Sequence, residues 1–422
     1  MISFKHFKNT YLILVLFLNF QLISCAQKKQ SQQNNLKTII ENKLDIKTGA
    51  ERTTLYLNLL KDKNIAIVAN QTSVLSTLQR AEVAPNVMGS KKVTQHLVDY
   101  LNNQKNITIQ KVFAPEHGFR GKADAAELVK DGKDSKTGLP IISLYGKNKK
   151  PTQEQLQDVD IVVFDIQDVG VRFYTYISTL HFVMEACAEA NIPVLILDRP
   201  NPNGHYIDGP VLEMEHTSFV GKHPVPVVYG MTIGEYGQMI NGEKWLKNGI
   251  QCDLTVIPLE NYKHNSEYSL AVRPSPNLPN DKSINLYPSL GFFEGTTINA
   301  GRGTEFQFQR YGAPFFPKVN FSYTPRVNFG AKYPKHKNEL CYGVDLAKTE
   351  KLSAINLEWL IDAYQKTPKN ENFFGSTFTI HAGNTKLQEQ IEQGLSAEEI
   401  RKTWTKDLNN FKKNRSKYLI YD

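Results

Sequence analysis

The sequence predicts an α/β protein, with a Rossmann-like parallel sheet domain followed by a second, smaller α+β domain. Apolar runs at 64–69, 107–114, 161–166 and 193–198 are continuous rather than alternating, which is typical of strands buried on both faces. Helical patterns separate these runs, as the crossovers of a parallel sheet require. After about residue 270 the chain becomes rich in Pro, Asn, Gly and aromatic residues, so we expect the second domain there.

Four helical segments can be placed between and after these strands. The segment 91–104 looks helical, and Thr232 and Glu235 fit a capping box, which makes Glu235 structural. A helix at about 174–190 has one apolar face, formed by Ile177, Leu180, Val183, Met184 and Cys187. The tail 397–421 is expected to be helical and to pack Trp404, Leu408 and Phe411.

The amino terminus has the pattern of an export signal. Lys5 and Lys8 precede an apolar run at 11–23 that is too short to span a bilayer comfortably. The run ends in Leu-Ile-Ser-Cys at Cys25, which resembles the bacterial lipobox, whose cysteine is lipidated; the alternative is an ordinary signal peptide with a chance cysteine. We therefore expect a signal peptide at 1–24 and a tether at 25–40. The protein would be exported and anchored through Cys25 to a bacterial membrane, in the periplasm or on the outer-membrane face.

The remaining chain is divided into a Rossmann-like catalytic domain at 41–270 and a substrate-binding domain at 271–422. The formal net charge is +8, and removal of the leader with Lys5 and Lys8 leaves +6. This charge is not concentrated in a basic stripe, which argues against nucleic-acid binding. Cys187, Cys252 and Cys341 show no zinc spacing; Cys187 suits a core position, and a disulfide between the other two is not indicated.

Familiar cofactor motifs are missing from the sequence. There is no P-loop and no G-x-S-x-G elbow, and no G-x-G-x-x-G follows the first strand. The stretch GRGTEF at 301–306 has Phe306 where the third glycine would stand. We therefore expect no cofactor and no metal, although Asp165 and Asp168 leave open a metal-dependent phosphohydrolase.

Polar side chains follow the predicted strands at their carboxyl ends. In an open parallel sheet, ligands bind beyond these ends. The stretches NQTS, PEHGFRG, DIQDVGVRFYTY and DRPNPNG should therefore form one rim. The rim contains Glu116, His117, Arg120, Asp165, Asp168, Arg172, Asp198, Arg199, Asn201 and Asn203. Each has a structural alternative, such as capping a turn or pairing with a neighbouring charge.

The stretch 291–316 is the second unusual region. Its glycines permit close backbone approach, and Arg302, Glu305 and Arg310 stand among aromatic residues. Aromatic platforms with interleaved polar groups suit sugars, whose C–H faces stack while their hydroxyls form hydrogen bonds. The alternative is a β-hairpin with a packed aromatic face.

Several stretches together resemble the NamZ-type exo-β-N-acetylmuramidases. The resemblance runs from about residue 44 to the carboxyl terminus and rests on IAIVANQTSV, FAPEHGFRG, FDIQDVGVRFYTYISTL, LDRPNPNG, GPVLE, PVVYGMTIGEYGQMIN and LYPSLGFFEGTTINAGRGTEFQFQRYGAP. It implies a Rossmann-like domain, a smaller second domain, and a site between them. It also implies release of terminal non-reducing N-acetylmuramic acid from peptidoglycan fragments, with Glu116 as the catalytic glutamate.

Such a glycosidase needs an acid and a group that assists at the anomeric carbon. Glu116 is the candidate acid, with His117 beside it. Asp168, Tyr174 or the 2-acetamido group of the sugar could assist, and the sequence leaves these three open. The lactyl carboxylate calls for an arginine, Arg302 first and Arg172 second. The rival interpretations are a lipid-anchored glycan-binding protein without turnover and the phosphohydrolase named above.

Overall fold

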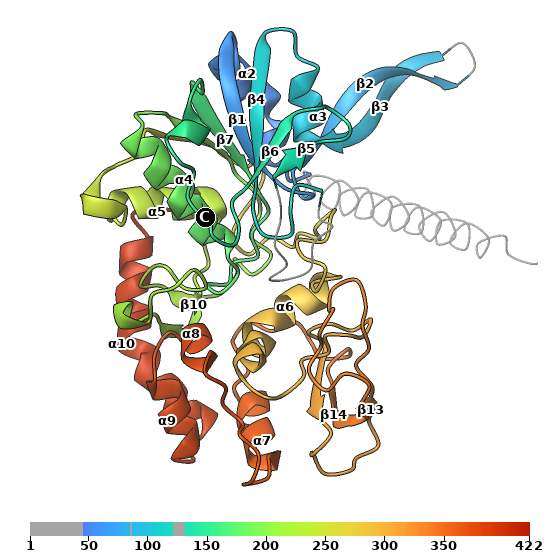
Figure 1. Ribbon diagram of the computed structural model, residues 1–422, viewed down its shortest axis with the longest axis vertical. Helices are drawn as coiled ribbons and strands as arrows, with labels where there is room; N and C mark the ends of the chain where they lie inside the picture. Colours follow the sequence, from blue (N-terminus) through green and yellow to red (C-terminus); the bar gives the residue numbers. More distant parts are fainter. Residues whose placement is uncertain (1–44, 85–86, 121–130) are drawn as a thin grey trace, which may run out of the picture. The chain divides into compact units, whose positions relative to one another are not determined.

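The computed structural model describes residues 45–84, 87–120 and 131–422, and 47–422 form one unit. Within them, a seven-stranded sheet has the order β11-β8-β7-β1-β4-β6-β5. All of its neighbouring strands are parallel except β5 and β6 (Figure 1). The elements of this part are η1 (Gly49–Glu51), α2 (Thr53–Leu60), β1 (Lys63–Ala69), β2 (Val74–Ala84), β3 (Val87–His96), α3 (Leu97–Asn102), β4 (Ile107–Ala114), β5 (Gly132–Lys133), β6 (Pro140–Ser143), η2 (Glu154–Leu156), β7 (Ile161–Asp165), α4 (Tyr176–Glu189), β8 (Val194–Leu197), β9 (Asp208–Val211), η3 (Met214–His216), β10 (Pro226–Val228), α5 (Ile233–Gly242), η4 (Lys247–Gly249) and β11 (Leu254–Ile257).

The order of the parallel strands reverses beside β1. The chain first adds β4 and β6 on one side of β1, then returns to its other side with β7, β8 and β11. This is the strand order of doubly wound nucleotide-binding sheets, in which ligands bind beyond the carboxyl ends of the strands where the order reverses, here β1 and β7. The predicted parallel α/β sheet is therefore confirmed, and its switch point is defined.

Successive residues of the central strands face opposite sides of the sheet, as the two-residue period of a strand requires. Ile65 and Ile67 pack into one hydrophobic core with residues of α2 and α3. Ala66 and Val68 pack into the other with α4 and α5. Because both faces are covered, the strands are apolar throughout, which explains the continuous runs in the sequence.

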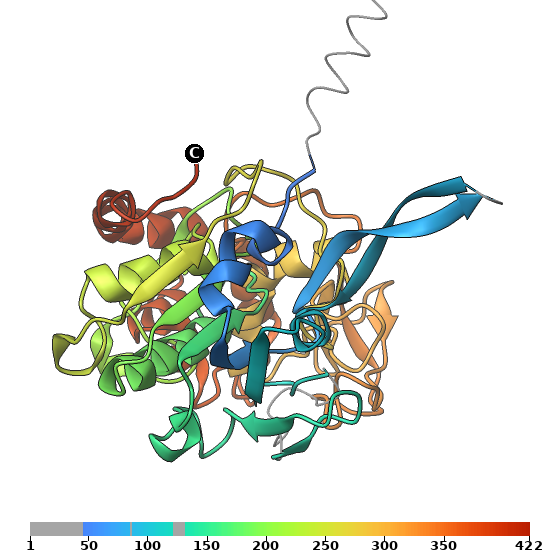
Figure 2. The same cartoon turned by 90° about the horizontal axis from the view of Figure 1, so that it is seen from above.

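One predicted helix is wrong in its first half. Residues 91–96 belong to β3, which pairs with β2 in an antiparallel hairpin, and only α3 is helical (Figure 2). Gln95 pairs with Leu75, and the Thr94 and Ser76 hydroxyls lie 2.9 Å apart across the strands. Cross-strand partners of this kind are remote in sequence, so a local pattern does not reveal them.

The other helical predictions hold. The helix predicted at 174–190 is α4, and the five residues of its apolar face are buried. The capping box of α5 is present: the Glu235 backbone N–H donates to Thr232 Oγ1 at 3.2 Å, and the Thr232 N–H donates to Glu235 Oε2 at 2.9 Å. The tail is helical over Ala397–Arg415 and buries Trp404 and Phe411.

The carboxyl-terminal region combines a small antiparallel sheet, β12-β14-β13, with helices. Of the stretch 291–316, η5 and β12 are regular, and a single bridge pairs Asn299 with Gly312, so the stretch is not a β-hairpin. The region shares the core of α4 and α5 rather than forming a separate one. Its elements are α6 (Asp281–Leu290), η5 (Gly291–Gly295), β12 (Arg310–Ala313), β13 (Ser322–Tyr323), β14 (Cys341–Asp345), α7 (Glu358–Lys366), α8 (Phe378–Ala382), α9 (Lys386–Glu392) and α10 (Ala397–Arg415).

The predicted leader, tether and Cys25 lie outside the described residues. Among the residues that are described, no helix is long and apolar enough to cross a membrane. Cys187, Cys252 and Cys341 are buried free thiols, and Cys187 belongs to the core as predicted.

Arg172 joins the amino-terminal and carboxyl-terminal regions. Its guanidinium is fully buried and donates to the carbonyl oxygens of Pro210, Val225, His381 and Ala382 at 2.7–2.9 Å. Burial lowers its pKa to about 9, so the group stays protonated at neutral pH. Arg172 was predicted to bind substrate, but these contacts make it a structural link between α8 and the β9–β10 ribbon.

We predict that Arg172→Met lowers the free energy of unfolding by more than about 3 kcal/mol, because four buried carbonyls lose their donor. Urea denaturation of the two proteins measures this difference. Arg326→Met, at an exposed arginine, is the control and should lie within about 0.5 kcal/mol of the parent. A variant at Arg172 as stable as the parent would show that these four bonds contribute nothing.

Candidate functional site

The switch point of the sheet lies where β1 and β7 end together. Ala69 pairs with Asp165 at the last position of the two strands. Asn70 follows β1, is buried, and donates from Nδ2 to the Tyr176 hydroxyl at 2.8 Å. Because Tyr176 is the first residue of α4, this bond fixes the start of that helix against the end of β1.

A tight turn places Glu116 just beyond β4. His117 and Gly118 both have positive φ, +70° and +75°, and the Gly118 N–H donates to the Pro115 carbonyl at 3.0 Å. A histidine in this conformation is uncommon, so the surrounding structure must hold it there. The turn leaves Glu116 half-buried while His117 is buried. This geometry explains why the strand ends in Pro-Glu-His-Gly rather than in ordinary loop residues.

Two hydroxyl groups, those of Thr175 and Tyr145, contact the Glu116 carboxylate. Thr175 Oγ1 donates to Glu116 Oε2 at 2.7 Å. Burial, together with the charge and hydrogen bond of Glu116, raises the pKa of Tyr145. Thr175 is the residue that precedes α4, so Glu116 lies at the positive end of this helix. Neither Thr175 nor Tyr145 was among the predicted site residues.

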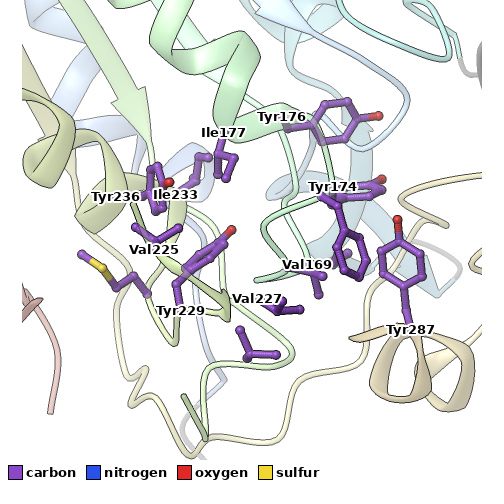
Figure 3. Close-up of a cluster of buried hydrophobic side chains, with 14 of the residues drawn as sticks. Val169, Tyr174, Tyr176, Ile177, Val225, Val227, Tyr229, Ile233, Tyr236 and Tyr287 are labelled. Atoms are coloured by element: carbon purple, nitrogen blue, oxygen red, sulfur yellow. The ribbon is translucent and has the colours of Figure 1, made fainter. Parts of the chain in front are cut away.

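Three buried tyrosines line the next part of the site. The rings of Tyr174 and Tyr176 lie 4.8 Å apart and those of Tyr174 and Tyr287 lie 6.2 Å apart (Figure 3). Tyr174 donates to the Pro274 carbonyl at 2.6 Å. Burial raises the pKa of each tyrosine above its usual value, so the hydroxyls stay protonated. This environment argues against Tyr174 as a nucleophile, since a phenolate would have to form there.

Asp168 is the second carboxyl group near these tyrosines. Its Oδ2 accepts from the Tyr229 hydroxyl and, at 2.6 Å, from the Gly170 N–H, whereas Oδ1 has no partner among the described residues. Burial raises its pKa to about 7, against the opposing effect of these bonds. The charges of Glu116 and Asp168 both raise the pKa of Tyr176 and of Tyr287, which places the two carboxyl groups around one tyrosine cluster.

Asp165 and Arg199 form an ion pair with each other. Arg199 donates to both carboxylate oxygens, at 2.6 and 2.9 Å, and both side chains are buried. The two were predicted to bind substrate, but this bidentate pairing occupies them. It also opposes the metal-dependent phosphohydrolase, because the Asp165 oxygens that would ligate a cation already bind a guanidinium.

Arg120 binds two carboxylates, those of Asp134 and Asp99. It donates to the two oxygens of Asp134 at 3.1 and 2.7 Å and to Asp99 at 3.2 Å. Its guanidinium also lies 4.3 Å from the centre of the Phe119 ring. These contacts are structural. The predicted contact of Arg120 with substrate stays a prediction.

The predicted asparagines hold loops together. Asn201 donates to the Met231 carbonyl at 2.8 Å and accepts from the Asn203 N–H at 2.8 Å. Asn203 donates to the carbonyls of Val169 and Ile284 at 2.9 and 3.1 Å. Both residues are buried, so they brace the loop that carries Asp168 against α6 rather than face an open site.

Arg302, Glu305 and Arg310 separate in the structure. Arg302 donates to Glu294 at 3.1 Å, and the charges of both lie close enough to Tyr287 to shift its pKa. Arg310 lies between aromatic rings, 4.2 Å from the centre of Phe306. Glu305 is exposed. Only Arg302 is therefore placed beside the tyrosine cluster.

Asn277 is a site candidate that the sequence did not single out. Its side chain is buried, yet neither amide atom has a partner among the described residues. It touches the backbone at Gly330, where an added Cβ would lie 2.8 Å from Asn277 Oδ1. The Gly330 carbonyl also accepts from Arg302 at 3.4 Å. The unusual stretch RPSPNLPN at 273–280 was the only signal for this residue.

Comparison with known proteins identifies the class as a glycosidase family. Residues 65–282 match the family described as Exo-beta-N-acetylmuramidase NamZ, N-terminal, and residues 285–421 match its C-terminal counterpart. The chain belongs to this family of exo-β-N-acetylmuramidases. The two matches meet near residue 283, while the boundary predicted near 270 stays a prediction.

Individual relatives agree with this assignment. The chain is 38% identical to the peptidoglycan β-N-acetylmuramidase NamZ of Bacillus subtilis, over 98% of this chain and 100% of that protein. A crystal structure of a DUF1343 family protein from Bacteroides fragilis matches 90% of this chain and 99% of its own, with 44% identity and a TM-score of 0.79. A second protein of that family and organism matches 89% and 99%, with 29% identity and a TM-score of 0.73.

The raised pKa of Asp168 predicts a pH dependence of stability. Between about pH 4 and pH 7 the folded protein keeps the Asp168 proton while the unfolded chain releases it, so this group makes the folded state less stable as pH rises. In the parent, the free energy of unfolding should fall with pH across this range, and Asp168 contributes up to about 1.4 kcal/mol per pH unit to that fall. We predict that Asp168→Asn removes this contribution. Urea denaturation across this range measures the slope.

Asp407→Asn, at an exposed carboxylate, is the matched control and should keep the parent slope. Asp198 has a pKa raised by burial to about 7 as well, so a slope remains in the Asp168 variant. An Asp168 variant with the same slope as the parent would contradict the assignment.

Proposed function

We propose that this protein is an exo-acting glycosidase that releases terminal non-reducing N-acetylmuramic acid from peptidoglycan fragments, with Glu116 as its catalytic acid. The observation that carries the proposal is the half-buried Glu116, presented by a strained turn at the sheet switch point and held by Thr175. The full-length relationship to the Bacillus subtilis enzyme supports the substrate class.

Hydroxyl partners suit a group that must give up and regain a proton. A hydroxyl donates to a carboxylate and accepts from a carboxylic acid, whereas a lysine or arginine can only donate. Thr175 and Tyr145 therefore serve both protonation states of Glu116. Arg120, a nearby cation along the chain, is neutralised by Asp134 and Asp99.

Assistance at the anomeric carbon is assigned to the 2-acetamido group of the substrate. The two protein candidates are poor nucleophiles: Tyr174 stays a buried phenol, and Asp168 is buried with a pKa of about 7. Some glycosidase families use substrate assistance of this kind. Asp168 then acts as a positioning residue beneath the tyrosine cluster.

Arg302 is the proposed partner of the lactyl carboxylate. Its side chain is 27% exposed and lies beside Tyr287, whose pKa the charges of Glu116 and Arg302 both affect. Arg172, the second candidate, is fully buried, and both of its terminal nitrogens donate to backbone carbonyls.

The first experiment compares an aryl β-N-acetylmuramide with the matching N-acetylglucosaminide. We predict turnover of the muramide alone, and a loss of about 10²- to 10⁴-fold in kcat/KM for Glu116→Gln, because a positioned acid contributes about that much. Glu371→Gln, at an exposed carboxylate outside the candidate site, should retain parental activity.

No turnover of either substrate would sink the enzyme proposal and leave a glycan-binding protein, provided that calorimetry detects muramide binding. The N-trifluoroacetyl analogue of the muramide tests the acetamido group. This analogue should react more slowly because its carbonyl oxygen is a weaker nucleophile, and an equal rate would return the assisting role to a protein side chain.

We further propose that Cys25 carries a lipid that anchors the exported protein to a membrane. The sequence pattern at 5–25 supports this placement. We predict that Cys25→Ala shifts the protein from the membrane fraction to the soluble fraction and abolishes incorporation of labelled palmitate. Cys187→Ala is the control, since that thiol is buried in the core and should not alter labelling. Unchanged membrane association of the Cys25 variant would contradict the anchor.

A further inference from the structure

A pocket lies beside α4, away from the amino-terminal end of this helix. It is a cavity of about 340 Å³, and its lining includes His181, Glu185, Lys222, His223 and Trp245. Its size is in the range of small-molecule sites. The mechanism proposed above does not use any of these residues.

The two histidines of this cavity are uncharged at neutral pH, because burial lowers the pKa of each. His181 Nδ1 and His223 Nε2 are hydrogen-bonded at 2.9 Å, and His223 stacks on Trp245 with ring centres 4.6 Å apart. Burial and the Lys222 charge lower the pKa of His181 to about 4. Glu185 already binds Lys150 at 2.8 Å. The wall therefore offers hydrogen bonds and a ring face, as a saccharide site does.

Half-buried aromatic rings connect this cavity with Glu116. Phe182, on α4, stacks with Phe219 at 6.2 Å between ring centres, and Phe219 contacts Tyr145 edge-on at 6.3 Å. Tyr145 is the residue whose pKa is raised by burial and by its hydrogen bond to Glu116. The side chains thus form a continuous row from the candidate acid to the cavity.

Lysines stand over the rings of this row. Lys149 Nζ lies 4.7 Å from the centre of Phe219, and Lys222 Nζ lies 4.8 Å from the centre of Phe182. Within the ranges that the structure covers, neither ammonium group pairs with a carboxylate. We name Tyr145, Lys149, Phe182, Phe219 and Lys222 the aromatic–lysine strip. Rings for stacking and uncompensated positive charges together match a saccharide that carries carboxylates.

We propose that the aromatic–lysine strip binds the leaving-group side of the substrate, the part of the glycan beyond the bond that is cleaved. Its sugar rings lie on Phe182 and Phe219, and its carboxylates pair with Lys149 and Lys222. The cavity at His181 and Trp245 receives the far end. This inference rests on the proposed glycosidase function.

The test compares two substrates in the mature chain: the aryl β-N-acetylmuramide, which ends at the scissile bond, and a longer peptidoglycan-derived saccharide that carries carboxylates beyond it. For the double variant Lys149→Gln and Lys222→Gln, we expect kcat/KM to fall at least about tenfold more on the saccharide than on the muramide. The difference should shrink at high salt and with a saccharide whose carboxylates are amidated.

Lys406→Gln, at an exposed lysine of α10, is the matched control and should leave both rates at the parental value. Equal effects of the double variant on both substrates, or none, would overturn the strip while leaving the glycosidase in place. Should the parent hydrolyse neither substrate, the proposed function fails instead. Calorimetry then tests the strip independently of turnover. It compares the affinity of the Glu116→Gln protein for the saccharide with and without the two lysine replacements, and the affinity must fall when the lysines are replaced.

Discussion

The buried ion pair between Asp165 and Arg199 is the interaction on which the site geometry depends. Asp165 is the last residue of β7, and Arg199 follows β8 by two residues, so the pair ties together two strand ends. Arg199 also donates to the Val74 carbonyl at 3.0 Å, which brings in the start of β2. Removing one partner of such a pair costs about 3–5 kcal/mol, because the other charge stays buried without compensation. The loop with Asp168 starts from this anchored point.

The strand order determines which loops lie beside the Asp165–Arg199 ion pair. Because the order reverses between β1 and β7, the loops after these strands diverge and leave room beyond their ends. Asn70 and the start of α4 close one side of that room through the bond to Tyr176. The turn after β4 brings Glu116 to the same place from the neighbouring strand. A carboxyl group, three tyrosines and a helix start therefore converge without any one segment of sequence containing them all.

The sequence predicted the sheet because strands that are buried on both faces form continuous apolar runs in the sequence. It placed Glu116 on the rim because the carboxyl ends of those runs must meet at one edge, whereas the catalytic role of Glu116 came from the family resemblance and stays a proposal. It could not tell a ligand-binding arginine from a structural one. Arg172, Arg199 and Arg120 all follow strands, but their partners lie on distant segments, such as the Ala382 carbonyl for Arg172. Thr175 and Tyr145 were missed for the same reason, since their contact with Glu116 exists only after folding.

The proposed role of Glu116 as a catalytic acid constrains where the neighbouring arginines can place their charge. A cation held against the carboxylate would favour its ionised form and oppose proton donation. The arginines of the rim are instead satisfied elsewhere: Arg120 by Asp99 and Asp134, and Arg199 by Asp165. The Thr175 hydroxyl that donates to Glu116 can serve either protonation state of the carboxyl group. The pairing of these two arginines fits the proposed role of Glu116, because it commits their positive charges to other carboxylates.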